Sequence, residues 1–286
     1  MAGCNHSWVQ HIRVELSSEH KTGLTLSYRV DWLFSQLTGD TMSRLLLLLP
    51  LFIAFSTNAT PKASVAVALM DESRPIEDKA RDGGRKPAEV MTFLGVEPGM
   101  TVIDVIAASG YYTEVLSRTV GPMGKVYAQN PAAVLKFRDG ANDKALGQRL
   151  ADNRLPNVIR WDKETTALEI APESIDFAMT ALNFHDIYNS SGKDAAVGFA
   201  KHIFDVLKPG AVFGVIDHEG AATADNQSLH RMHGELALEA LLEAGFSIES
   251  TSNTLRNSED DLSKMVFDPS IRGKTDRFLI KAVKPR

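Results

Sequence analysis

The sequence has a single cysteine, Cys4, among its 286 residues. This count excludes a disulfide framework and a cysteine metal site, and a mature chain without Cys4 has no thiolate nucleophile. The chain also lacks any run of basic residues, since 31 Lys and Arg stand against 36 Asp and Glu, for a net charge of −5. A nucleic-acid partner usually requires a basic patch or stripe, so we expect none.

An apolar run long enough for a stable membrane span, about 20 residues, is missing as well. The apolar segment Leu45–Phe55 has eleven residues; it follows a charged start at Met42 and precedes small residues up to Ala68. This order is typical of a secretory signal peptide. We therefore expect residues 1–41 to be a misassigned extension before the true start at Met42, residues 42–68 to be signal-like, and residues 69–286 to form one domain.

This organisation predicts a periplasmic or secreted protein if Met42 is the true start, and a short membrane anchor is the alternative. Residues 61–75 are polar and rich in alanine, which is typical of an exported linker.

The most informative segment is a predicted strand, turn, helix and second strand. The apolar strand Val102–Ile106 leads through a small-residue turn into a helix, and Lys125–Gln129 forms the next strand. Such a βαβ unit builds a ligand pocket at the carboxyl ends of its strands. Ile106 and Ala108 stand where a dinucleotide fingerprint has its first two glycines, and only Gly110 remains. A nucleotide-dependent oxidoreductase is therefore disfavoured.

Further apolar runs alternate with helical patterns along the rest of the chain. The predicted strands span residues 158–161, 175–182 and 211–216, with a closing pair at 246–250 and 278–283, and the predicted helices span residues 87–94, 193–207 and 229–244. Strands that alternate with helices indicate an α/β fold, with a parallel sheet covered by helices on both faces.

Polar or aromatic residues stand at the end of each of the five central strands. In chain order they are Asp104; Gln129 and Asn130; Trp161 and Asp162; Asn183, His185 and Asp186; and Asp217, His218 and Glu219. Ligands of open α/β sheets bind outside the carboxyl ends of the strands, so the joint placement of these residues predicts a binding cleft at one edge of the sheet.

The turn around Asp104 and Gly110 resembles motif I of the class I S-adenosylmethionine (SAM)-dependent methyltransferases. The resemblance is closest to a bacterial group of predicted methyltransferases that often carry export signals, and it covers about residues 72–286. Further matching segments follow in the same order: Arg81–Glu89, Gly110–Glu114, Val126–Asn130, Asn183–Asp186, Leu207–Gly210, Asp217–His218, Leu229–Arg231 and Phe267–Phe278.

The resemblance implies a Rossmann-like class I methyltransferase fold, with a mixed seven-stranded sheet, helices on both faces and an antiparallel last strand. It also implies SAM as cofactor and methyl transfer to a small acceptor. The implied cofactor-binding residues are Asp104, Ala108, Gly110, Tyr111, Thr113, Gln129, Asn130, Asp162 and Asn183.

Individual roles follow from the same resemblance. Asp104 would organise the turn and face the ammonium or sulfonium end of SAM. Gln129 and Asn130 replace an acidic residue that grips the ribose hydroxyls in the family. Asp162 would contact the adenine amino group, with Glu164 as the alternative.

Three residues are candidates for a general base: His185, Asp186 and His218. A base is needed only if the acceptor must lose a proton. The spacing of these residues matches no dedicated metal motif, so the sequence predicts no metal site. Two charge-dense segments, 255–261 and 272–277, predict a lid whose arginines would suit an anionic acceptor.

A non-catalytic ligand-binding protein on the same fold is the main alternative. It is favoured by the signal-like segment and by Ala107, Ala108 and Ser109, where motif I departs from its usual glycine-rich form.

Overall fold

The computed structural model describes residues 61–286. The expectations for residues 1–41, and for the signal-like segment as far as residue 60, lie outside the described residues. Within residues 61–286, the helices are all too short or too polar to cross a membrane.

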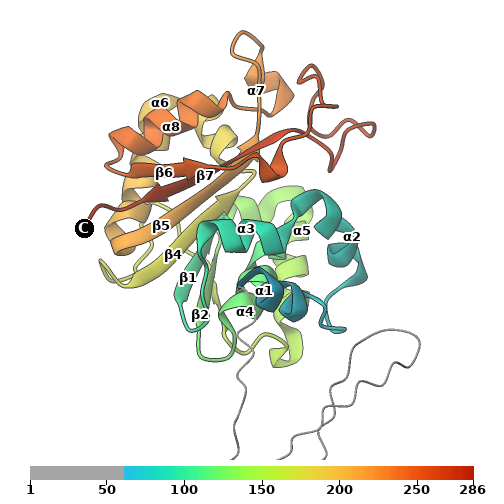
Figure 1. Ribbon diagram of the computed structural model, residues 1–286, viewed down its shortest axis with the longest axis vertical. Coiled ribbons are helices and arrows are strands. Elements are labelled where there is room, and N and C mark those ends of the chain that lie inside the picture. The colour runs from blue at the N-terminus through green and yellow to red at the C-terminus, as the bar shows by residue number, and fades with distance from the viewer. Residues whose placement is uncertain (1–60) are drawn as a thin grey trace, which may run out of the picture. The chain divides into compact units, whose positions relative to one another are not determined.

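A seven-stranded sheet forms the centre of the fold, with strand order β3-β2-β1-β4-β5-β7-β6 (Figure 1). β1 to β5 are parallel, and β7 runs antiparallel to both β5 and β6. The strands are β1 Thr101–Val105, β2 Lys125–Gln129, β3 Val158–Trp161, β4 Ile175–Ala181, β5 Leu207–His218, β6 Ser247–Thr251 and β7 Arg277–Val283. The predicted mixed sheet with an antiparallel last strand is confirmed.

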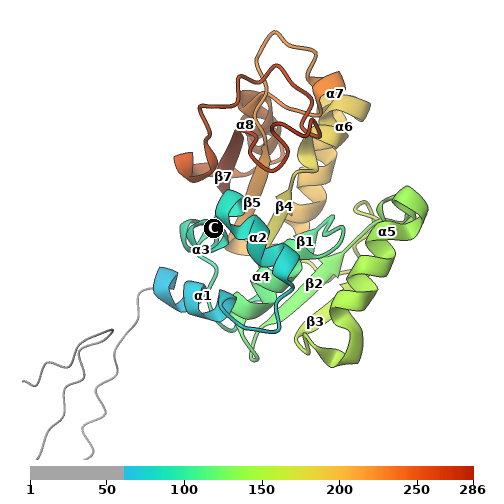
Figure 2. The same cartoon turned by 90° about the vertical axis from the view of Figure 1, so that its right-hand side faces the viewer.

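Helices cover both faces of this sheet, as predicted. They are α1 Pro61–Leu69, α2 Ile76–Arg85, α3 Pro87–Leu94, α4 Tyr111–Val120, α5 Ala132–Leu150, α6 Phe184–Val206, α7 Asn226–Leu229 and α8 Gly234–Glu243. α1, α3 and α4 pack on one face, in the cluster that contains Val102, and α6 and α8 pack on the other, in the cluster that contains Ile103. Because successive strand residues point to opposite faces, a strand buried on both faces is apolar throughout. Figure 2 shows α5 beside β2 and β3.

The first helix corrects the linker expected over residues 61–75. Residues Pro61–Leu69 form α1, and its Val65 and Leu69 are buried at 6% and 7% exposure against α3 and α4. Val65 and Leu69 are four residues apart, so they share one helix face, and the intervening alanines hid this apolar stripe from a composition argument. Arg74 then fixes the following turn through paired hydrogen bonds to Asp82 at 2.7 and 2.9 Å.

Two helix boundaries near the strand ends also differ from prediction. α6 is kinked at Gly192 (φ 81°, ψ 178°), so the helix predicted from residue 193 is its second part, and the unpredicted first part begins at Phe184 and places His185 and Asp186 in its first turn. The helix predicted over residues 229–244 begins only at Gly234, as α8, because the short α7 ends at Leu229 and His230 after it is left-handed (φ 53°). As a result, His185 and His230 both lie at the carboxyl end of the parallel strands.

Candidate functional site

The turn after β1 has the backbone of a glycine-rich loop although it holds one glycine. Ile106, Ala108 and Gly110 have φ values of 58°, 51° and 83°. A left-handed conformation costs a residue with a Cβ roughly 1–2 kcal/mol, and a β-branched residue such as Ile106 adopts it rarely. Such strain persists only where the surrounding structure holds it in place.

Three carboxamide side chains hold this turn. Gln129 Oε1 accepts a hydrogen bond from the Ile106 N–H (2.9 Å), and Asn183 Nδ2 donates to the Ile106 carbonyl (3.1 Å). Asn130 Oδ1 accepts from the Ala108 N–H (2.8 Å), and its Nδ2 donates to the Ala108 carbonyl (3.2 Å). An amide both donates and accepts, so it satisfies the two backbone groups of one strained residue, which a carboxylate cannot do.

The resemblance assigned Gln129 and Asn130 to the ribose of SAM, but the structure shows both side chains bonded to the protein itself. Gln129 and Asn130 are fully buried, and Gln129 Nε2 also donates to the Lys163 carbonyl at 2.6 Å. The side-chain oxygen and nitrogen of each residue are hydrogen-bonded to backbone groups, so in this structure the two residues stabilise the conformation of the turn.

Asp104 and Thr113 lie beneath the surface of the edge. Asp104 is 2% exposed, and its Oδ2 accepts a hydrogen bond of 2.6 Å from the Thr113 hydroxyl. Burial raises the pKa of Asp104 to about 7, although the Thr113 bonds act in the opposite direction. In this structure the pair links β1 to α4 and does not reach the surface where the sequence placed a cofactor contact.

Gly110 and Tyr111 contact the helices around the turn. A Cβ on Gly110 would lie 2.9 Å from Leu146 Cδ1 and 3.0 Å from Arg149 Cδ, so α5 approaches this position closely. The Tyr111 hydroxyl donates to Asp82 (2.6 Å) in α2. Asp162 is exposed and accepts a hydrogen bond from Arg160 Nε at 2.8 Å.

A buried carboxylate joins the ends of β4 and β5. Asp217 is fully buried; its Oδ2 accepts the His185 backbone N–H (2.8 Å), and its Oδ1 lies 2.7 Å from His185 Nδ1. Burial by itself lowers the pKa of His185, but the Asp217 and Asp186 carboxylates outweigh it and raise that pKa to about 10.

His218 lies beside His185, but its pKa is lowered whereas that of His185 is raised. Their ring centroids are 5.9 Å apart. Burial, and then the positive charges of Arg277 and His185, lower the pKa of His218 well below its ordinary value. Its Nδ1 lies 2.8 Å from the Thr275 hydroxyl, whose oxygen also accepts a hydrogen bond from Arg277 Nε at 3.1 Å.

A cationic cavity of about 580 Å³ opens beside His218. Its lining includes Arg81, Arg85, Arg272, Lys274 and Arg277, and no acidic residue of the described chain lines it. Arg81 pairs with Asp78, whereas the other four cations have no ion-pair partner within residues 61–286. Residues 272, 274 and 277 of the charge-dense segment 272–277 thus line a cavity beside His218, and their predicted role as a lid over an acceptor stays a prediction.

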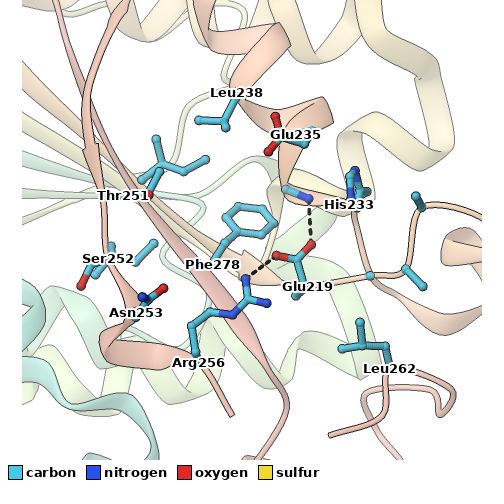
Figure 3. Close-up of a pocket in the computed structure, with 16 residues that line it drawn as sticks. Glu219, His233, Glu235, Leu238, Thr251, Ser252, Asn253, Arg256, Leu262 and Phe278 are labelled. Carbon is cyan, nitrogen blue, oxygen red and sulfur yellow. Dashed lines mark hydrogen bonds and ion pairs between the residues drawn. The ribbon is translucent and has the colours of Figure 1, made fainter. Parts of the chain in front are cut away.

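Glu219 belongs to a different cavity from His218, although the two are adjacent in sequence. Figure 3 shows Glu219 among His233, Arg256 and Phe278, in a cavity of about 360 Å³. Its Oε1 accepts from the Gly234 N–H (2.9 Å), and its Oε2 accepts from Arg256 (2.7 Å). Glu219 therefore stabilises the start of α8.

Comparison with known proteins defines the fold. No protein-family model matches the sequence, and no curated protein matches it. Among solved structures, a SAM-dependent methyltransferase from Aquifex aeolicus is similar, at 21% identity and a TM-score of 0.52, over 69% of this chain and 89% of that one. The [4+2]-cyclase SpnF is similar at 16% identity and a TM-score of 0.52, over 71% of this chain and 80% of that one.

An arsenic(III) SAM methyltransferase from Chlamydomonas reinhardtii also matches, at 16% identity and a TM-score of 0.50, over 78% of this chain and 73% of that one. Likeness at these identities establishes the fold alone. The chain therefore has the α/β fold of class I methyltransferases, and the cyclase among its neighbours shows that this fold also carries other chemistry.

The strain in the turn can be measured with two adjacent alanines. Ala107→Gly, at a position without a positive φ, should lower the free energy of unfolding by about 1 kcal/mol through added chain entropy. Ala108→Gly should be neutral or stabilising, because relief of roughly 1–2 kcal/mol of left-handed strain offsets that entropy. Urea denaturation of both variants measures the difference between their free energies of unfolding. Equal destabilisation would show that Ala108 is not strained.

The buried Asp104 should make stability depend on pH. The folded chain holds this proton up to a pKa of about 7, against 3.8 for an unperturbed aspartate, so it binds more protons than the unfolded chain between these values. The contribution of Asp104 to the free energy of unfolding should therefore fall by roughly 2–4 kcal/mol as pH rises from about 4 to about 7, whereas carboxylates with a lowered pKa, such as Asp78 and Glu114, contribute in the opposite direction.

Asp104→Asn keeps an acceptor for Thr113 and removes the titration, so its unfolding free energy should be flatter across this window. The exposed Asp162→Asn variant should behave as the parent does. If Asp104→Asn retained the parent's slope in urea denaturation between pH 4.5 and 8, another group would be responsible.

Proposed function

We propose that the protein is a SAM-dependent methyltransferase that acts on a small anionic acceptor. The observation that carries this proposal is the left-handed turn at Ile106, Ala108 and Gly110, which three carboxamides hold in shape despite two side chains. It lies at the sheet edge where ligands of this fold bind, and the cavity at the same end is lined by four cations that have no ion-pair partner within residues 61–286.

The residues at this edge fit one end of SAM better than the other. The N-terminus of α4, which follows Gly110, has the dipole that suits a carboxylate, although its first turn is buried in this structure. The end of β2 presents no acidic side chain to a ribose, and the amides there are already bonded to the turn. Ribose recognition, if it occurs, must use other groups.

SAM supplies an activated methyl group, and the protein's contribution is then mainly alignment and proton removal. Arg85, Arg272 and Lys274 line the cavity and would hold an anionic acceptor beside the turn. His218 lines the same cavity, and its lowered pKa keeps it neutral at pH 7, so it can accept the acceptor's proton. His185, with a raised pKa, is charged at pH 7 and is poorly suited to this role.

Direct binding tests the proposal. The full chain should bind SAM and S-adenosylhomocysteine in calorimetric titration, and both should raise its melting temperature, whereas NAD should do neither. Binding of NAD alone would favour an oxidoreductase. The absence of heat and of a thermal shift with either sulfur ligand at millimolar concentration would favour the non-catalytic alternative.

Transfer is tested separately, by incorporation of tritiated methyl groups from labelled SAM into an envelope extract of the native host. His218→Ala should keep SAM affinity within a few-fold of the parent and lower transfer by roughly 100-fold if His218 is the base. His233→Ala, in the cavity of Glu219, is the matched control and should leave transfer unchanged. An equal loss of binding and transfer in His218→Ala would show that this residue supports the fold or the cofactor instead.

The cellular location remains a prediction from residues 42–68. Export by a cleaved signal would be compatible with the fold if cleavage falls near Ala59, because cleavage at Ala68 would remove the buried Val65 of α1.

A further inference from the structure

We infer that His185, Asp186 and His230 form a binding site for a first-row divalent transition-metal ion. This inference goes beyond methyl transfer and does not depend on it. His185 Nε2, Asp186 Oδ1 and His230 Nδ1 all lie within 4.8 Å of one another. Asp186 Oδ1 is 3.1 Å from the His185 nitrogen and 3.3 Å from the His230 nitrogen. Ligand atoms held about 2.0–2.2 Å from one tetrahedral ion are separated by roughly 3.3–3.5 Å.

The buried His185 provides a second, independent observation. The residue is 3% exposed, and its buried Nε2 lies 3.1 Å from Asp186 Oδ1 but makes no hydrogen bond of good geometry within the described residues. A buried polar atom normally has a partner, so this nitrogen requires an explanation. It is directed towards Asp186 and His230, whose ligand atoms lie on that side of the ring.

Asp217 holds His185 in the orientation that a metal ligand needs. One carboxylate oxygen lies 2.7 Å from Nδ1 and the other accepts the His185 backbone N–H at 2.8 Å. A histidine that binds a metal usually donates its other ring N–H to a carboxylate or carbonyl, which fixes the ring and its tautomer. With Nδ1 still protonated, a metal ion would displace the proton that Nε2 carries in the charged form and bind its lone pair.

His230 is fixed by the residues that follow it. Arg231 is fully buried and pairs with both oxygens of Asp260, at 2.9 and 3.0 Å. The Met232 N–H donates to the His218 carbonyl (3.0 Å), which attaches this segment to the end of β5. The His230 ring packs against Phe267, with centroids 5.2 Å apart. Two separate segments therefore hold the histidines close together, and neither depends on an ion to do so.

The ligand set selects the class of ion. Two imidazole nitrogens and one carboxylate suit Zn²⁺, Fe²⁺ or Co²⁺, whereas Mg²⁺ and Ca²⁺ prefer oxygen ligands. The negative charges of Asp186 and of the adjoining Asp217 would balance a divalent cation. Three protein ligands leave coordination positions open, and Phe267 and His218 border both this cluster and the cationic cavity. An anionic molecule in the cavity could therefore also bind the ion.

Metal titration of the full chain tests the inference without any assay of activity. After treatment with a chelator and its removal, the protein should bind one equivalent of Zn²⁺ in calorimetry. Co²⁺ should produce visible absorption bands that report nitrogen and oxygen ligands.

His230→Ala and Asp186→Asn change partly exposed side chains, and each should weaken Zn²⁺ binding by at least tenfold and alter the Co²⁺ spectrum. Asp217→Asn should weaken it by roughly 10- to 100-fold. His233→Ala, only three residues from His230 but outside the cluster, is the control and should bind as the parent does. Circular dichroism confirms that each variant is folded.

Two results would overturn the inference. One is no saturable Zn²⁺ or Co²⁺ binding at micromolar protein, which would leave His185 and Asp217 as a hydrogen-bonded pair alone. The other is binding that His230→Ala and Asp186→Asn leave unchanged, which would place the ion at another histidine. SAM binding is measured on the same samples, so failure of the metal site is distinguishable from failure of the proposed function.

Discussion

The candidate site depends on hydrogen bonds between three carboxamide side chains and the strained turn that follows β1. Gln129 and Asn130 extend from β2 and Asn183 follows β4, yet all three bind the backbone of Ile106 or Ala108 after β1. A typical buried hydrogen bond contributes about 1 kcal/mol, which is comparable with the strain of one left-handed residue with a Cβ. The four bonds together can therefore maintain the turn, and they also fix three strand ends relative to one another.

The fold could be predicted because its signals are local. Strands buried on both faces are apolar runs, and their alternation with helices implies the parallel order around β1 and β4. Errors arose where distant contacts decide the structure. The helix predicted over residues 229–244 is interrupted because Arg231 is buried against Asp260, 29 residues further along the chain. Periodicity within a window cannot reveal such a pairing.

The sequence predicted which strand ends meet at one edge of the sheet, but it did not predict which of their side chains face one another. Topology brings strand ends together, so the sequence could place Asp217, His218 and Glu219 at the same end of the sheet. His218 and Glu219 line different cavities, because successive residues of an extended chain point to opposite faces, and the sequence analysis did not apply this rule to them. His230 was missed as a partner of His185 because it lies 45 residues away, in a segment predicted to be helical.

The charges around His185 and around His218 favour opposite protonation states of the two rings. Around His218 the charged neighbours are cations, so its neutral form is favoured, and it is able to take up a proton. Around His185 the nearest charges are the carboxylates of Asp186 and Asp217, so a positive charge is favoured there, whether a proton or a metal ion carries it. The two rings are 5.9 Å apart, so a positive charge held at His185 further disfavours protonation of His218. A positive charge at His185 thus keeps His218 in its neutral form and at the same time makes it a weaker base.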